Sequence, residues 1–261
     1  MSLSRIKGLL LQEFYITYQS LEVIMDLLFF SIITTVTFGF FYSYTSSTDK
    51  TLASYLYMGL LMMEIIRITQ YTTSLNALWN IWSRNLSNLF VTPLSITEYL
   101  AAQMISGAVK AGVIFVLISF FANWLFQFNI FSVGILNLFL FYINLVIFSW
   151  SFGIAVLGII FKFGSRFSAF AWSLVFLLQP IMATFYPVSV LPKAIQYISY
   201  SLPPTYVFES ARAALVNPSV NWYHLSISFS LNIFYFVLSL WFFNQMFKAS
   251  KETGQFARNE G

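Results

Sequence analysis

Cysteine is absent from this chain of 261 residues, and histidine occurs only once. Without cysteine the chain has no disulfides, no thiolate metal site and no cysteine nucleophile. The single histidine, His224, is too few for a histidine-rich metal centre or a relay of histidines. These absences exclude several common kinds of catalytic and metal site.

Charge is also scarce. Charged residues make up 8% of the chain, whereas soluble domains carry roughly 25%. The mean hydropathy is +0.76. This composition excludes an ordinary soluble fold. The formal net charge of +4 is spread over few residues, so we do not expect nucleic-acid binding.

Nucleotide and hydrolase motifs are missing as well. No glycine is followed by lysine, so the phosphate-binding pattern G-x-x-x-x-G-K-[ST] does not occur. No G-x-S-x-G elbow accompanies any of the serines. We expect a chain without catalytic residues, metal or cofactor of its own.

Long apolar stretches are what the chain does contain. Six of them reach the roughly 20 residues that a helix needs to cross about 30 Å of hydrocarbon. Long runs, rather than short alternating segments, indicate helices and not a barrel. We predict an all-α membrane protein with a transmembrane domain over residues 21–247, whose spans are 21–43, 52–73, 100–124, 134–161, 167–186 and 223–247.

The distribution of lysine and arginine predicts the orientation. An even number of spans puts both termini on one side, and that side collects Arg5, Lys7, Arg84, Lys162, Arg166, Lys248, Lys251 and Arg258. The other side has Lys50, Lys193 and Arg212. We therefore expect both termini in the cytoplasm, with residues 248–261 as a cytoplasmic tail.

Residues 1–20 precede the first span and lack the apolar core of a cleavable signal peptide, so we expect them to be retained. Ile6, Leu10, Phe14 and Tyr18 lie four residues apart. This spacing favours an amphipathic helix in the cytoplasmic interface, although a cytoplasmic extension of the first span has the same pattern.

Residues 187–215 are apolar but interrupted by prolines, which break helices. We predict a broken segment that dips into the outer leaflet or lies on it. The prolines and charged residues that we assign to this segment are Pro187, Pro192, Pro203, Pro204, Glu209 and Arg212.

Ionisable residues inside the predicted spans are the best candidates for functional groups, because ionised side chains in hydrocarbon are costly. Glu64 and Arg67 lie three residues apart on the second span, so they share a helix face and can form an ion pair. Lys110, together with Asp26 and Glu22, would complete a network in the cytoplasmic half. The network either holds the helices in register or lines a substrate path.

Aromatic residues make up 20% of the chain, and many of its Trp and Tyr residues fall near predicted span boundaries. An interfacial belt explains this pattern. A surface on which sugar rings stack would show it too.

Two stretches carry a more specific signal. The loop after the second span reads WSRNLSNLFVTPLSITEYL over residues 82–100, and the outer segment reads YPVSVLP over 186–192 and LPPTYVFESAR over 202–212. In their order along the chain, in the spacing of their residues and in their predicted side of the membrane, the two stretches resemble the ABC-2 family of ABC-transporter permeases.

The resemblance implies a membrane subunit that exports its substrate with energy from a separate ATPase, which holds the ATP and Mg²⁺. It further implies a homodimer, an interfacial N-terminal helix, a re-entrant segment before the sixth span, and a cytoplasmic coupling helix that docks into the ATPase. The coupling residues would be Arg84, Leu86, Leu89, Phe90 and Pro93, with Lys162 and Arg166 as a second inner contact.

From spacing alone, a helix in the first inner loop either docks on a partner or rests on the membrane. The substrate implied is hydrophobic or amphipathic: a drug, a lipid or a lipid-linked glycan. The alternatives are an ion-coupled secondary transporter, which would need inverted repeats, a membrane-embedded enzyme, and a scaffold. We expect the chain in the cytoplasmic membrane, in contact with lipid.

Overall fold

The structure, a computed structural model, describes residues 2–82, 93–164 and 167–252. Within these residues every regular element is a helix. The elements are α1 (Leu3–Gln19), α2 (Leu21–Ile24), a π-helix (Met25–Phe30), α3 (Ser31–Ser46), α4 (Lys50–Trp82), α6 (Ile96–Phe126), a 3-10 turn (Ile130–Val133), α7 (Ile135–Phe163), α8 (Ser168–Leu178), a 3-10 turn (Val188–Val190), α9 (Lys193–Tyr200), α10 (Pro203–Val216) and α11 (Trp222–Glu252).

Five of the described helical segments are long and apolar enough to cross a membrane: Leu21–Ser46, Lys50–Ser74, Ile96–Phe126, Ile135–Phe163 and Trp222–Glu252. They coincide with five of the six predicted spans. The all-helical membrane class is therefore confirmed.

The fifth predicted span, at residues 167–186, is not confirmed. α8 has 11 residues, which reach only about 17 Å at 1.5 Å per residue. Turns follow α8, where Pro180 has no N–H with which to continue a helix and Ala183 adopts a φ of 53°. Apolar length alone did not reveal this break.

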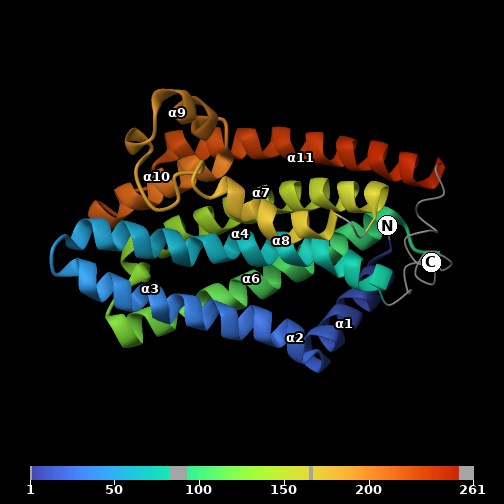
Figure 1. Cartoon of the computed structure of the whole chain (residues 1–261), viewed down its shortest axis with the longest axis horizontal. Helices are drawn as coiled ribbons and strands as arrows, with labels where there is room; N and C mark the ends of the chain where they lie inside the picture. Colours follow the sequence, from blue (N-terminus) through green and yellow to red (C-terminus); the bar gives the residue numbers. More distant parts are fainter. Residues whose placement is uncertain (1, 83–92, 165–166, 253–261) are drawn as a thin grey trace.

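The helices form an elongated bundle in which the start of α1 and the end of α11 lie at one end, and α9 and α10 lie at the other (Figure 1). α3 and α4 are antiparallel, since Tyr57 donates to the carbonyl of Thr35 while Ser31 donates to Glu64. α7 and α11 are parallel, because Asn232 bonds Asn144 and, further along both helices, Ser250 bonds Phe161. The chain between α7 and α11 must therefore return along the bundle, and α8 makes part of that return.

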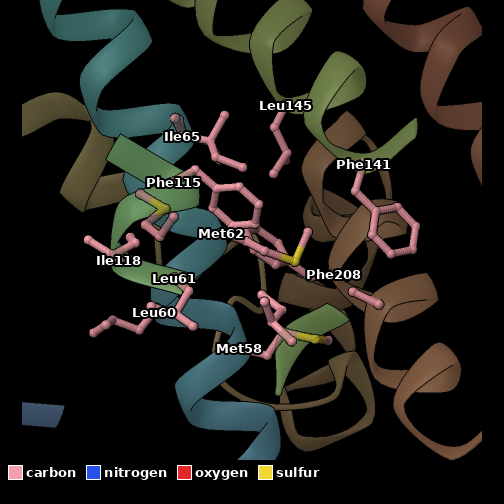
Figure 2. Packing of buried hydrophobic residues seen from close by; sticks show 14 of the residues in the cluster. Met58, Leu60, Leu61, Met62, Ile65, Phe115, Ile118, Phe141, Leu145 and Phe208 are labelled. Atoms are coloured by element: carbon pink, nitrogen blue, oxygen red, sulfur yellow. The ribbon is translucent and has the colours of Figure 1, made fainter. Parts of the chain in front are cut away.

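α4 is the central helix of the bundle. Its apolar side chains Met58, Leu61, Met62 and Ile65 are buried among residues of α6, α7 and α10 (Figure 2). Two glycines on neighbouring helices let their backbones approach α4: a Cβ at Gly107 would lie 3.1 Å from the Thr69 carbonyl, and one at Gly153 would lie 2.8 Å from Thr73 Cβ. Since lipid tails are as apolar as the core, such close packing is a main source of helix association in a membrane.

Candidate functional site

The largest group of charged side chains inside the spans lies where the first span meets α4. The first span is irregular at this point, because Met25–Phe30 forms a π-helix, an element that frequently occurs at functional sites. Asp26 belongs to the π-helix and Ser31 begins α3. Glu64 and Arg67 come from the middle of α4.

Arg67 is the hub of this cluster. Its Nη2 and Nε lie 2.9 and 3.1 Å from Glu64 Oε2, and Nη2 also donates to Ser31 Oγ at 3.0 Å. Ser31 Oγ donates to Glu64 Oε2 at 2.7 Å, so Glu64 and Ser31 are bonded to each other as well as to the guanidinium. The guanidinium carbon lies 4.7 Å from the centre of the Phe30 ring, within cation–π range. The Glu64–Arg67 pair that their spacing predicted is formed.

The two carboxylates of the cluster are held differently. Glu64 is 7% exposed and receives three short bonds, all at one oxygen. Asp26 is 21% exposed, and Arg67 Nη1 reaches its two oxygens only at 3.3 and 3.5 Å. Glu64 is thus held inside the bundle by short hydrogen bonds. Asp26 has only long hydrogen bonds to Arg67, and its carboxylate is partly exposed at the surface of the bundle.

A cavity of about 230 Å³ lies beside Asp26 and Arg67. Its other walls are Phe30, Gln70 and Tyr71, with Val175 and Phe176 of α8. Phe30 and Phe176 are each 44% exposed, so the cavity reaches the outer surface of the bundle between the first span and α8. A carboxylate, a guanidinium and three aromatic rings therefore line one cavity between two candidate spans and α8.

Lys110 does not belong to this cluster, which corrects the expectation of one network with Asp26, Glu64 and Arg67. Its Nζ lies 3.4 Å from Glu13 Oε2 of α1, and Glu13 also accepts from Gln103 Nε2 at 3.1 Å. Glu13 is buried on the face of α1 that packs against α6. Glu22, also expected in the network, is exposed. Residue spacing could not pair Glu13 with Lys110, because the two residues are 97 positions apart and lie on different helices.

The apolar stripe predicted on α1 divides between two environments. Ile6 and Leu10 pack against a buried cluster of the bundle, while Phe14 and Tyr18 are exposed. Interfacial placement of α1 stays a prediction.

The start of α1 is bonded to the start of α6. Arg5 Nη1 lies 3.2 Å from Glu98 Oε2 and also donates to the Pro93 carbonyl. The Ser2 amide donates to Glu98 Oε1 at 2.6 Å. Ser95 and Glu98 form a capping box, which satisfies free backbone N–H groups at the start of α6. The end of the loop between α4 and α6 is therefore bonded to both helices α1 and α6.

Most of the predicted coupling residues lie outside the described residues, namely Arg84, Leu86, Leu89 and Phe90. Pro93 is described and exposed. Of the second inner contact, Lys162 lies in the last turn of α7, and Arg166 is outside the described residues. Their roles stay predictions.

The proline-rich segment folds back onto the bundle. Arg212, buried in α10, lies 3.0 Å from Glu209 and donates to the Ala183 carbonyl at 2.9 Å. Glu209 accepts from the amide of Val188 at 2.7 Å. The two charged residues thus hold the turns on either side of Pro187 against α10. Pro192 precedes α9, and Pro203 and Pro204 begin α10 at positions where a missing N–H costs nothing.

Two polar contacts were not anticipated from the sequence. Asn232 Nδ2 of α11 donates to Asn144 Oδ1 of α7 at 3.1 Å, and both residues are fully buried. Ser250 Oγ donates to the Phe161 carbonyl at 2.5 Å. Asparagine inside an apolar span is a signal that sequence reasoning could have used.

A bundle of this length and composition, with five candidate spans among its described residues, defines a polytopic membrane protein. Within the described residues, no group of three or more His, Cys, Asp or Glu side chains is placed to hold a metal ion.

The chain matches the family model of the ABC-2 type transporter over residues 5–216. It therefore belongs to the ABC-2 type transporter family, the membrane components of ABC transporters that act with a partner ATPase. No curated protein matches the chain.

Proposed function

We propose that the chain is the permease subunit of an ATP-driven exporter for a hydrophobic or amphipathic substrate. It would work as a homodimer in the cytoplasmic membrane, with ATP and Mg²⁺ bound by a separate ATPase subunit. The observation that carries this proposal is the match to the ABC-2 type transporter over residues 5–216.

The coupling element of the proposal is the loop with Arg84, Leu86, Leu89, Phe90 and Pro93, which would dock into the ATPase. The contacts at the end of this loop support the assignment. Because Arg5 bonds both Pro93 and Glu98, a displacement of the loop would move α1 and α6 together. The ion pair of Glu13 with Lys110 would carry that displacement further along α6.

The proposed topology has six crossings with both termini in the cytoplasm. α8 and the turns after it would make the fifth crossing, with the segment around Glu209 and Arg212 re-entering from the outside. The parallel course of α7 and α11 supports an odd number of crossings between them. The excess of lysine and arginine on the N-terminal side supports the orientation.

Co-purification tests the proposed function. The tagged chain is co-expressed with candidate ATPases, and the complex is assayed for ATP hydrolysis in lipid. We expect one ATPase to bind wild type, and Leu86→Asp to abolish binding because it places a charge in an apolar docking surface. Val190→Asp, at an exposed site near α9, is the matched control and should bind normally. Equal binding by both variants would contradict the coupling assignment, and no bound ATPase at all would contradict the proposed function.

A further inference from the structure

The cavity beside Asp26 has an excess of negative charge. Glu64 and Arg67 neutralise each other through short bonds inside the bundle. Asp26 adds a second carboxylate, which Arg67 reaches only at 3.3 Å or more. Lys110 of α6, which was expected to join this cluster, pairs with Glu13 instead. Ionised Asp26 therefore leaves one negative charge uncompensated in a membrane-embedded site.

An uncompensated carboxylate inside a membrane is costly, and a bound cation offsets that cost. Asp26 retains capacity for such a partner, because an ionised carboxylate has about four lone-pair sites. Arg67 does not offer an equivalent site to an anion, since its donors are already directed to Glu64, Ser31 and Asp26.

The remaining walls suit an organic cation better than a metal ion. Phe30, Tyr71 and Phe176 line the cavity together with Val175. Aromatic faces attract organic ammonium groups, and an aromatic cage is a common way to bind them. Phe30 already makes such a cation–π contact, because the guanidinium carbon of Arg67 lies 4.7 Å from the centre of its ring. The volume of about 230 Å³ accommodates a headgroup rather than a whole lipid.

The opening of the cavity indicates where the rest of the ligand would lie. Phe30 and Phe176 are both partly exposed on the outer surface of the bundle, so an apolar chain attached to the headgroup would extend out between the first span and α8. A ligand with a charged head and an apolar chain could thus enter sideways from the bilayer.

We propose that this cavity binds the cationic headgroup of an amphipathic compound, with the Asp26 carboxylate beside the positive charge and Phe30, Tyr71 and Phe176 around it. The inference rests on the proposed transport function, because it names the class of substrate that would be transported. This class is amphipathic amines and quaternary ammonium compounds. It does not depend on which ATPase drives the protein.

A binding measurement on the isolated chain tests this site. The purified protein is placed in nanodiscs of phosphatidylcholine, and decyltrimethylammonium is titrated with empty nanodiscs as the blank. Decanol and decyl sulfate provide the same chain with a neutral and an anionic head. We expect wild type to bind the cation at least about tenfold more tightly than decanol or decyl sulfate, a difference of roughly 1.4 kcal/mol.

Asp26→Asn removes the charge and keeps an oxygen that Arg67 can bond. It should weaken binding of the cation about tenfold and leave decanol binding unchanged. Asp49→Asn is the matched control: Asp49 is exposed in the turn between α3 and α4, and its carboxylate caps α4, a role that asparagine fills equally well. This variant should bind like wild type.

Phe176→Leu is a second variant that does not depend on the folding of Asp26→Asn, because Phe176 is partly exposed. It removes one aromatic wall and should weaken binding of the cation several-fold. Equal affinity of wild type for the cation and for decanol, or full affinity in both variants, would overturn the inference. If the ATPase co-purifies in that case, the permease function stands and only the site is wrong.

Discussion

Replacement of Arg67 by methionine tests how much the charge cluster stabilises the bundle. The substitution keeps an unbranched side chain of similar reach but leaves Glu64 buried without its cation. Arg67 donates two bonds to Glu64 and one to Ser31 at 3.1 Å or less. Removing one partner of a buried ion pair costs about 3–5 kcal/mol, because the other charge stays buried and uncompensated. We expect a loss of that size in the free energy of unfolding.

A double variant separates the ion pair from simple loss of packing. In Arg67→Met with Glu64→Met the buried carboxylate of Glu64 is gone as well, while Asp26 loses Arg67 in both variants, so its contribution cancels when the two are compared. The double variant should therefore be more stable than Arg67→Met alone by about 2 kcal/mol or more, since Glu64 no longer leaves a buried charge without its partner.

The assay is equilibrium unfolding in mixed micelles, followed by the fluorescence of the seven tryptophans. Lys193→Met is the control, because it removes an exposed cation from α9 and should change stability by less than about 0.5 kcal/mol. The reasoning fails if Arg67→Met costs no more than Lys193→Met. It fails equally if the stability lost by the double variant equals the sum of the losses measured for Arg67→Met and Glu64→Met separately.

Two further predictions concern helix contacts. Gly59→Ala should lower the free energy of unfolding by about 1–3 kcal/mol, because the added Cβ would lie 2.1 Å from the carbonyl oxygen of Thr184. Gly8→Ala is the control. Its added Cβ meets nothing within 4 Å, so this substitution should instead raise the thermal midpoint slightly. Lys110→Met removes the cation paired with Glu13, so backbone hydrogen exchange in α1 should become about tenfold faster. Lys7→Met, at an exposed position on α1, should leave that exchange unchanged, and equal rates in both lysine variants would contradict the role of the ion pair.

Much of the fold could be predicted from the sequence because the membrane imposes it. Backbone groups in hydrocarbon need partners within their own segment, so long apolar stretches become helices. The pair of Glu64 with Arg67 could also be predicted, since both lie on one helix and their spacing fixes their geometry.

Features that depend on contacts between distant segments could not be predicted in this way. Within the mainly apolar residues 167–186, where α8 ends at Leu178, Pro180 is a local signal that hydropathy overlooks, whereas the turn at Ala183 is held by a hydrogen bond from the distant Arg212. The partner of Lys110 is decided by how α1 packs against α6, which hydropathy does not encode. The same holds for the cavity beside Asp26, whose walls come from three segments of the chain.

Cross-linking from a single cysteine tests the central claim, that this chain is driven by a separate ATPase through its first inner loop. Because the chain contains no cysteine, Leu89→Cys introduces one reactive thiol in the proposed coupling segment, and Val190→Cys introduces one at an exposed site near α9. With a short thiol–amine cross-linker in intact membranes, we predict that Leu89→Cys joins the chain to the ATPase and Val190→Cys does not. Absence of an ATPase adduct from Leu89→Cys, or an equal yield from both positions, would contradict the account.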